Sequence, residues 1–295
     1  MASTRRIGRA FKSDTFRITV CHTPSSGSYR EAPIIGTWIR ERAPMYRVLI
    51  FFLAVAALSQ QRQISYSGLT EGQTVSGFRT TAVYLDDAGQ AIGARFRHER
   101  TGFTLDLLEI QSVPQSYIWV TTYPTSNMGE AHTQEHLLVG KGSKGRALGS
   151  KEAMSLVTSG AFTRQWTTCY NFYVSAGPEV FYQFFESTLD ALLHPDYSDE
   201  EIRREVRNFG VSADPKTGVL RLEEKGTVYN EMSTTMDQAG ARLFDAAKHL
   251  MFGPEHPLAF NSGGTPAALR LLKPEDIRRF HAQHYFCLLY TSRCV

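Results

Sequence analysis

Two histidines and a glutamate with the spacing of a metal site lie near the middle of the chain, in the segment His132-Thr-Gln-Glu135-His136. Side chains four residues apart share one face of a helix, with Cβ atoms about 5–6 Å apart, so both imidazoles can bind one Zn²⁺ ion. Glu135 borders the same face, where it can take a proton from a metal-activated water and pass it to a leaving amine. The spacing is the inverted form of the zincin motif and predicts a zinc-dependent hydrolase. The alternative is a pair of surface histidines beside an ordinary glutamate.

A catalytic zinc ion also needs a third protein ligand and one open position. Carboxylates in a later segment are the candidates, and they are Glu205, Glu223, Glu224 and Glu231. Spacing alone does not choose among these four glutamates.

The elements that must position these residues change in character along the chain. Alternating apolar and polar residues predict an antiparallel meander with strands at 81–85, 94–98, 104–108 and 117–122. Helical periods and end signals predict helices at 129–140, 151–158 and 178–193, from 198 onward, within 220–251, and at 274–286. Between them, aromatic and β-branched residues predict strand at 161–175. This order predicts an α+β fold, an antiparallel-rich sheet with helices packed on one face.

The composition excludes several classes of protein. The chain is 42% apolar and 21% charged, as globular proteins are, and its net charge of +3 is too small to indicate nucleic-acid binding. Of the four cysteines only Cys169 lies in the central body, so we expect neither an internal disulfide nor a cysteine-based zinc site there.

The two ends of the chain differ from its body. Residues 45–59 have a basic start, an apolar run and a small-residue exit, which predicts a signal peptide cut before Gln60 and an exported, periplasmic or secreted protein without a permanent membrane span. Residues 1–44 are expected to be a disordered leader that arises from a start site placed too early, with Met45 as the true start. Residues 287–295 resemble the translation of a sequencing adapter. We therefore expect one domain, 60–286, whose last helix is truncated.

Further motifs accompany the histidine segment in a fixed order: 130–138, 142–144, 160–163, 168–170, 225–232, 262–266 and 280–285. Together they resemble the first domain of the insulinase/pitrilysin family of zinc metallopeptidases, and within it the branch that contains presequence protease. Two positions depart from the family pattern. Gly160 stands where the family usually has Asn, and Trp166 where it usually has Asp.

The resemblance implies a metalloendopeptidase that hydrolyses peptides or unfolded protein segments and binds one Zn²⁺ per chain. It implies that His132, His136 and Glu231 are the metal ligands and that Glu135 is the catalytic base. Glu224 would contact the metal ligands without binding the metal itself. A substrate peptide would add as a strand to the sheet edge formed by Gly160, Ala161, Phe162 and Thr163.

The family closes a chamber from several similar domains. The resemblance therefore implies that missing carboxy-terminal domains of the same polypeptide are partners of this one, and that the isolated fragment is inactive. The alternative is a non-catalytic partner subunit or peptide-binding module that keeps the fold. Such subunits typically lose the zinc motif, so its presence here favours the enzyme.

Overall fold

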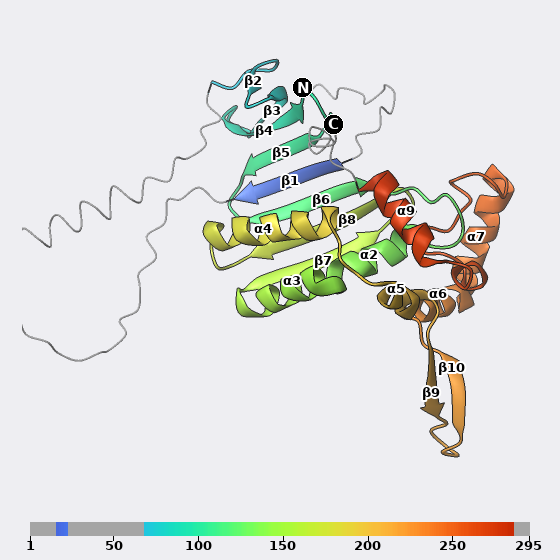
Figure 1. Cartoon of the computed structure of the whole chain (residues 1–295). Helices are drawn as coiled ribbons and strands as arrows, with labels where there is room; N and C mark the ends of the chain where they lie inside the picture. The colour runs from blue at the N-terminus through green and yellow to red at the C-terminus, as the bar shows by residue number, and fades with distance from the viewer. Residues whose placement is uncertain (1–15, 23–67, 286–295) are drawn as a thin grey trace, which may run out of the picture.

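The computed structural model describes residues 16–22 and 68–285, which are built around an eight-stranded sheet (Figure 1). The strand order is β2-β3-β4-β5-β1-β6-β8-β7, and every pair is antiparallel except β1 with β5. The strands are β1 (Phe16–His22), β2 (Thr74–Val75), β3 (Phe78–Leu85), β4 (Ala91–His98), β5 (Thr104–Glu109), β6 (Gln115–Thr121), β7 (Val157–Thr163) and β8 (Thr167–Val174). The sheet is therefore antiparallel-rich, as predicted.

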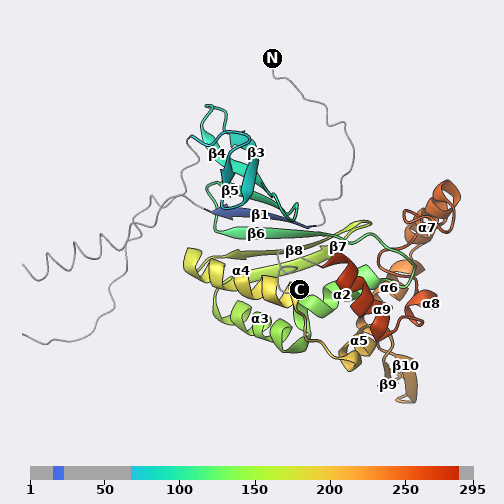
Figure 2. The ribbon, with the colours of Figure 1, turned by 45° about the horizontal axis from the view of Figure 1, so that its top comes forward.

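Helices cover one face of this sheet, which Figure 2 shows nearly edge-on with α2, α3 and α4 on the same side. The helices are α2 (Glu130–Gly140), α3 (Gly142–Met154), α4 (Pro178–Leu193), α5 (Asp199–Val206), α6 (Thr227–Asp237), α7 (Ala239–Phe252), α8 (Pro266–Leu269) and α9 (Pro274–His284). Helices α5, α6 and α9 gather around α2. The α+β architecture with helices on one face confirms the predicted fold class.

The core between α4 and the sheet is aromatic. Helix α4 begins at Pro178, whose fixed φ suits the first helical position. Its Phe181, Phe184 and Phe185 rings lie 5.5, 4.9 and 6.3 Å from the ring of Phe172 on β8. Aromatic pairs at such distances add to the stabilisation from area burial. This packing fixes β8, and with it the neighbouring strand β7.

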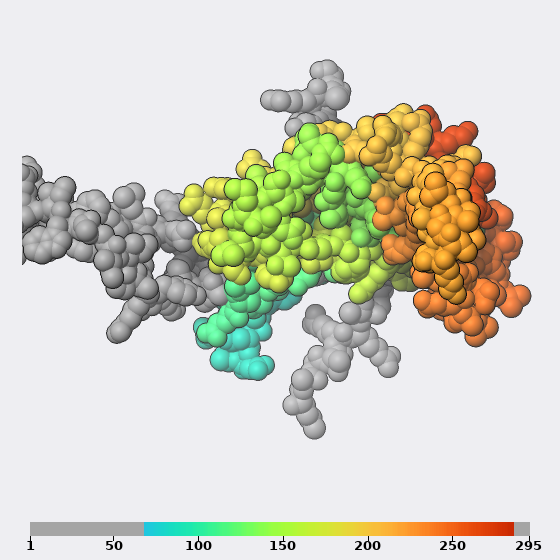
Figure 3. Space-filling view, turned by 90° about the horizontal axis from the view of Figure 1, so that it is seen from below, coloured from blue at the N-terminus to red at the C-terminus, as the bar shows by residue number. Residues whose placement is uncertain are grey.

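The segment 220–251, predicted to be helical, begins instead with a strand. Strand β10 (Leu220–Glu224) pairs with β9 (Phe209–Ala213) in a hairpin that projects from the body, and Figure 3 shows it in front of the carboxy-terminal helices. The turn is formed by Asp214, whose Oδ1 accepts hydrogen bonds from the backbone N–H groups of Lys216 and Thr217. This Asp-Pro-Lys-Thr-Gly turn signal outweighs the helical pattern that follows it.

Two other boundaries also differ from the expectation. Helix α3 ends at Met154 and β7 begins at Val157, so the predicted helix 151–158 spans the junction between them. The predicted strand 161–175 is a hairpin, because residues 164–166 turn the chain between β7 and β8. The hairpin places β7 at the edge of the sheet.

Strand β1 lies within the segment that was expected to be a disordered leader. Its backbone pairs with β5 in parallel and with β6 in antiparallel register, in the interior of the sheet. The prediction of disorder is therefore wrong for residues 16–22, whose alternating, β-branched sequence suits a strand. Residues 45–59, the rest of 1–44 and 287–295 lie outside the described residues. None of the helices within 68–285 combines the length and apolar character that crossing a bilayer requires.

Truncating Phe181, which is 1% exposed, should lower the free energy of unfolding by about 3–5 kcal/mol, because Phe181→Ala leaves a cavity under β8. Tyr182→Ala is the matched control, since Tyr182 is 54% exposed and its loss should cost no more than about 0.5 kcal/mol. Urea unfolding followed by circular dichroism measures both. Equal destabilisation by the two variants would contradict this description of the core.

Candidate metal centre

The histidine helix α2 begins at Gly129, and the backbone at that position requires glycine. Gly129 has φ +72°, and a Cβ there would lie 2.6 Å from the carbonyl oxygen of Gly263. The close approach packs the 261–264 loop against the first turn of α2. Asn127 joins the same regions, because its side-chain oxygen accepts a hydrogen bond from the backbone N–H of Asn261.

Three predicted ligands meet at one point. His132 and His136 lie one turn apart on α2, with ring centroids 4.7 Å apart and ring planes perpendicular. Glu231 on α6 faces both, its Oε1 3.6 Å from His132 Nε2 and its Oε2 3.5 Å from His136 Nε2. One ligand atom from each residue lies within 4.8 Å of the others. Two of the four glutamates left open by spacing, Glu223 and Glu224, lie instead on the projecting hairpin.

The carboxylate–imidazole separations come close to those around a tetrahedral zinc ion. Ligand atoms about 2.0–2.1 Å from a shared Zn²⁺ lie about 3.3–3.4 Å from one another in a tetrahedron. The two carboxylate–imidazole distances are only slightly longer, but each joins a different oxygen of Glu231, and one atom from each residue lies within 4.8 Å of the others. The side chain of Glu231 is 52% exposed whereas those of His132 and His136 are 12% and 22% exposed, so solvent reaches the cluster from the α6 side.

Glu205 on α5 orients one of the histidines. It is 1% exposed, and its Oε2 lies 3.2 Å from His136 Nδ1 while its Oε1 forms an ion pair with Lys141 at 2.9 Å. When Nδ1–H donates a hydrogen bond to Glu205, the neutral ring of His136 carries its lone pair on Nε2. This atom points toward Glu231. The sequence analysis left Glu205 as one of four possible ligands. Its contact with His136 depends on how α5 packs against α2, which no local pattern shows.

Burial and charge shift the pKa values of these groups in different directions. Burial lowers the pKa of His132, and the neighbouring His136 lowers it further. Burial also opposes protonation of His136, but the hydrogen bond that His136 donates to Glu205, together with the negative charge of Glu205, raises the His136 pKa overall. For Glu205, burial is outweighed by the hydrogen bonds from His136 and Lys141, which lower its pKa. Glu205 therefore carries a negative charge beside His136.

Glu135 faces the cluster from the same helix and is held by the edge of the sheet. The Thr163 hydroxyl on β7 donates a 2.6 Å hydrogen bond to Glu135 Oε2. Burial raises the pKa of Glu135, and the Thr163 hydrogen bond partly offsets this. Because that bond occupies one carboxylate oxygen, the other is left to exchange a proton.

The remaining predicted site residues divide into two groups. Gly160, Ala161, Phe162 and Thr163 lie on the edge strand β7, which the Thr163 hydrogen bond connects to Glu135. Glu224, which the resemblance placed beside the ligands, pairs instead with Arg270 at 2.7 and 2.9 Å, and that ion pair lowers the Glu224 pKa to about 2. The carboxylate within hydrogen-bond distance of a predicted histidine ligand is Glu205, and the supporting role of Glu224 stays a prediction.

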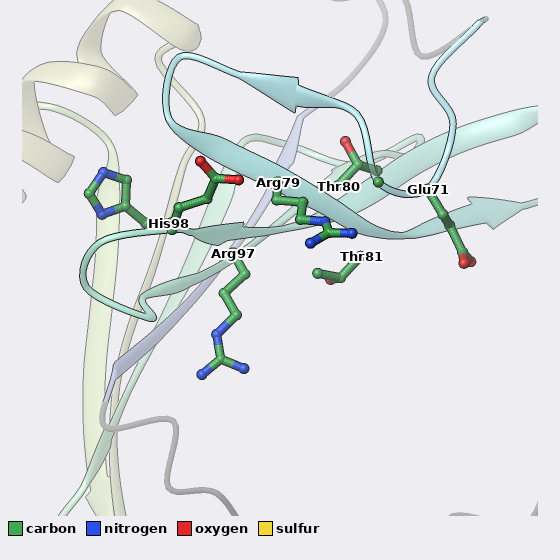
Figure 4. Close-up of a pocket in the computed structure, with 8 residues that line it drawn as sticks. Glu71, Arg79, Thr80, Thr81, Arg97 and His98 are labelled. Atoms are coloured by element: carbon green, nitrogen blue, oxygen red, sulfur yellow. The ribbon is translucent and has the colours of Figure 1, made fainter.

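A pocket of about 620 Å³ lies near the opposite edge of the sheet, lined by residues 71–72, by β3 and by the end of β4. Arg79 and Arg97 are directly opposite in the β3–β4 register, yet their guanidinium groups point in different directions, and His98 points away from both (Figure 4). These side chains do not converge on one point, in contrast to the cluster of His132, His136 and Glu231.

Sequence comparisons find relatives of this chain, but no protein-family model matches it. It is 30% identical over 197 residues to an uncharacterized protein of Saccharomyces cerevisiae, covering 65% of this chain and 18% of that protein. It is 26% identical over 265 residues to the mitochondrial presequence protease of Emericella nidulans, covering 83% of this chain and 24% of that enzyme. The chain thus spans about a fifth of the length of the relatives it matches.

A structural comparison identifies the fold. The crystal structure of pitrilysin superposes with a TM-score of 0.53 and 18% identity, covering 72% of this chain and 22% of pitrilysin. The chain therefore has the pitrilysin fold, and part of it is similar in sequence to part of presequence protease.

Proposed function

We propose that this chain is the metal-bearing domain of a zinc endopeptidase that hydrolyses peptides or unfolded protein segments. The observation that carries the proposal is the convergence of His132 Nε2, His136 Nε2 and the Glu231 carboxylate beside Glu135. Two imidazoles and one carboxylate with solvent access on one side are the donor set of catalytic rather than structural zinc.

In this proposal His132, His136 and Glu231 hold one zinc ion, and Glu205 keeps His136 in the tautomer that binds metal. When bound, zinc lowers the pKa of a coordinated water to about 7. Glu135 takes a proton from the attacking water and delivers it to the leaving amine, while Thr163 keeps its carboxylate in place. The substrate adds as a strand to β7, whose end at Thr163 contacts Glu135.

We further propose that the active enzyme contains additional domains of the same polypeptide. The relatives support this proposal, because the segment that matches this chain makes up only about a fifth of their length. Export by the 45–59 segment remains part of the proposal, and it can be tested by locating the protein after cell fractionation.

The chain should bind one zinc ion. His132→Ala and Glu231→Ala should each abolish binding, because two ligands do not complete the site. Glu135→Gln should retain the metal, because Glu135 is not a ligand. Elemental analysis after dialysis measures the stoichiometry, and circular dichroism checks folding. Full zinc content in Glu231→Ala would contradict the assigned ligand set.

Glu205→Gln should weaken zinc binding by about 10- to 100-fold, because the charge that supports His136 is lost. Glu224→Gln is the matched control: it also removes a carboxylate that is ion-paired, but at Arg270, so affinity should stay within about twofold. Competition titration against a chromophoric chelator gives both affinities. If the control weakens binding as much as Glu205→Gln does, Glu205 has no special role.

The purified chain should hydrolyse an unstructured fluorogenic peptide slowly or not at all, even when loaded with zinc, because it spans only about a fifth of its relatives. The measurement is peptide turnover with and without a chelator. Zinc-dependent turnover that disappears in Glu135→Gln would show that this domain is sufficient and would refute the need for further domains.

A further inference from the structure

The free edge of β7 offers backbone groups at alternate residues only. In the β7–β8 hairpin, the backbone N–H of Arg164 donates to the carbonyl oxygen of Thr167, so these two residues form a hydrogen-bonded pair. Pairing alternates along an antiparallel ladder, and the register pairs Gly160 with Asn171 and Phe162 with Cys169. The backbone groups of Ser159, Ala161 and Thr163 therefore point away from β8.

One of these outward positions is already occupied. The backbone N–H of Ser159 donates to Glu152 Oε1 at 2.8 Å, and the Ser159 hydroxyl donates to Glu152 Oε2 at 2.7 Å. Glu152 lies in the last turn of α3, seven residues before Ser159, and both of its carboxylate oxygens are used. A partner strand cannot pair with Ser159 while this contact holds.

We propose that Glu152 is a specificity-determining residue that ends the peptide-binding edge at Ser159. The inference rests on the proposed addition of a substrate strand to β7. A peptide can then pair only with the outward groups of Ala161 and Thr163, which span about 7 Å of strand. The site therefore binds a short extended segment of the peptide next to the cleaved bond. A longer extended segment does not increase the affinity.

The same contact protects the edge of the sheet. An exposed edge strand with unpaired backbone groups is a template for pairing with other chains, and charged side chains are one means of blocking it. Glu152 places a carboxylate at the far end of the edge, while Glu135 lies at the Thr163 end. The interval between these two carboxylates defines the length of strand that can be added.

The test compares two fluorescein-labelled unstructured peptides, about four and about ten residues long, on the zinc-loaded chain by fluorescence anisotropy. The wild-type chain should bind both with similar affinity. Glu152→Ala should bind the longer peptide about tenfold more tightly, since it frees an additional backbone pairing position. Glu152→Gln, which keeps an acceptor for Ser159, should resemble the wild type. Glu186→Ala, which removes an exposed glutamate on α4, is the matched control and should change neither affinity.

A second measurement does not depend on peptides: hydrogen exchange at the Ser159 amide should be faster in Glu152→Ala than in the wild type. Unchanged exchange, or the same dependence on peptide length in both chains, would overturn the inference and leave the proposed peptidase intact. Glu152→Gln behaving like Glu152→Ala would also overturn it. If neither chain binds any peptide, strand addition at β7 is wrong and the inference falls with it.

Discussion

The structure depends on the burial of a polar helix. In α2 the side chains of Gln134 and Glu135 are 0% and 8% exposed, although neither is apolar. A buried polar group without a partner costs about 1–3 kcal/mol. The surroundings of α2 supply hydrogen bonds to several of its polar groups, while Gln134 Nε2 has no partner among the described residues. Tyr197 donates to Gln134, Thr163 donates to Glu135, and Glu205 pairs with His136. The elements around α2 are held in place by the same contacts that arrange the proposed metal ligands.

This requirement explains why two carboxylates far apart in sequence converge on one helix. Glu205 lies in the last turn of α5 and Glu231 lies on α6, and the β9–β10 hairpin between them returns the chain to the same side of α2. The base of the hairpin is tied to the body by the ion pair of Glu224 with Arg270. Glu205 is 1% exposed and contacts both His136 and Lys141, so it links the packing of α5 to the orientation of His136.

The parts of the site that could be predicted are those encoded locally. The two histidines and Glu135 lie within one and a half turns of a helix, so their spacing alone places them on one face. The choice of Glu231 needed the family resemblance, because spacing along the chain does not show which of the later glutamates returns to α2. The contact of Glu152 with the β7 edge depends on how α3 meets the sheet, and no motif marks it. The sheet and its helical layer were predictable from periodicity, whereas their junctions were not.

Strand β1 lies between two strands that are consecutive in the sequence. β5 and β6 are consecutive and joined by residues 110–114, yet they flank β1 and pair with it over six positions each. A start at Met45 or cleavage before Gln60 would each separate residues 16–22 from the domain. The facing backbone groups of β5 and β6 would then lack partners, at a cost that a buried ladder does not tolerate. Pairing on both sides therefore makes residues 16–22 an integral strand of this sheet, between β5 and β6.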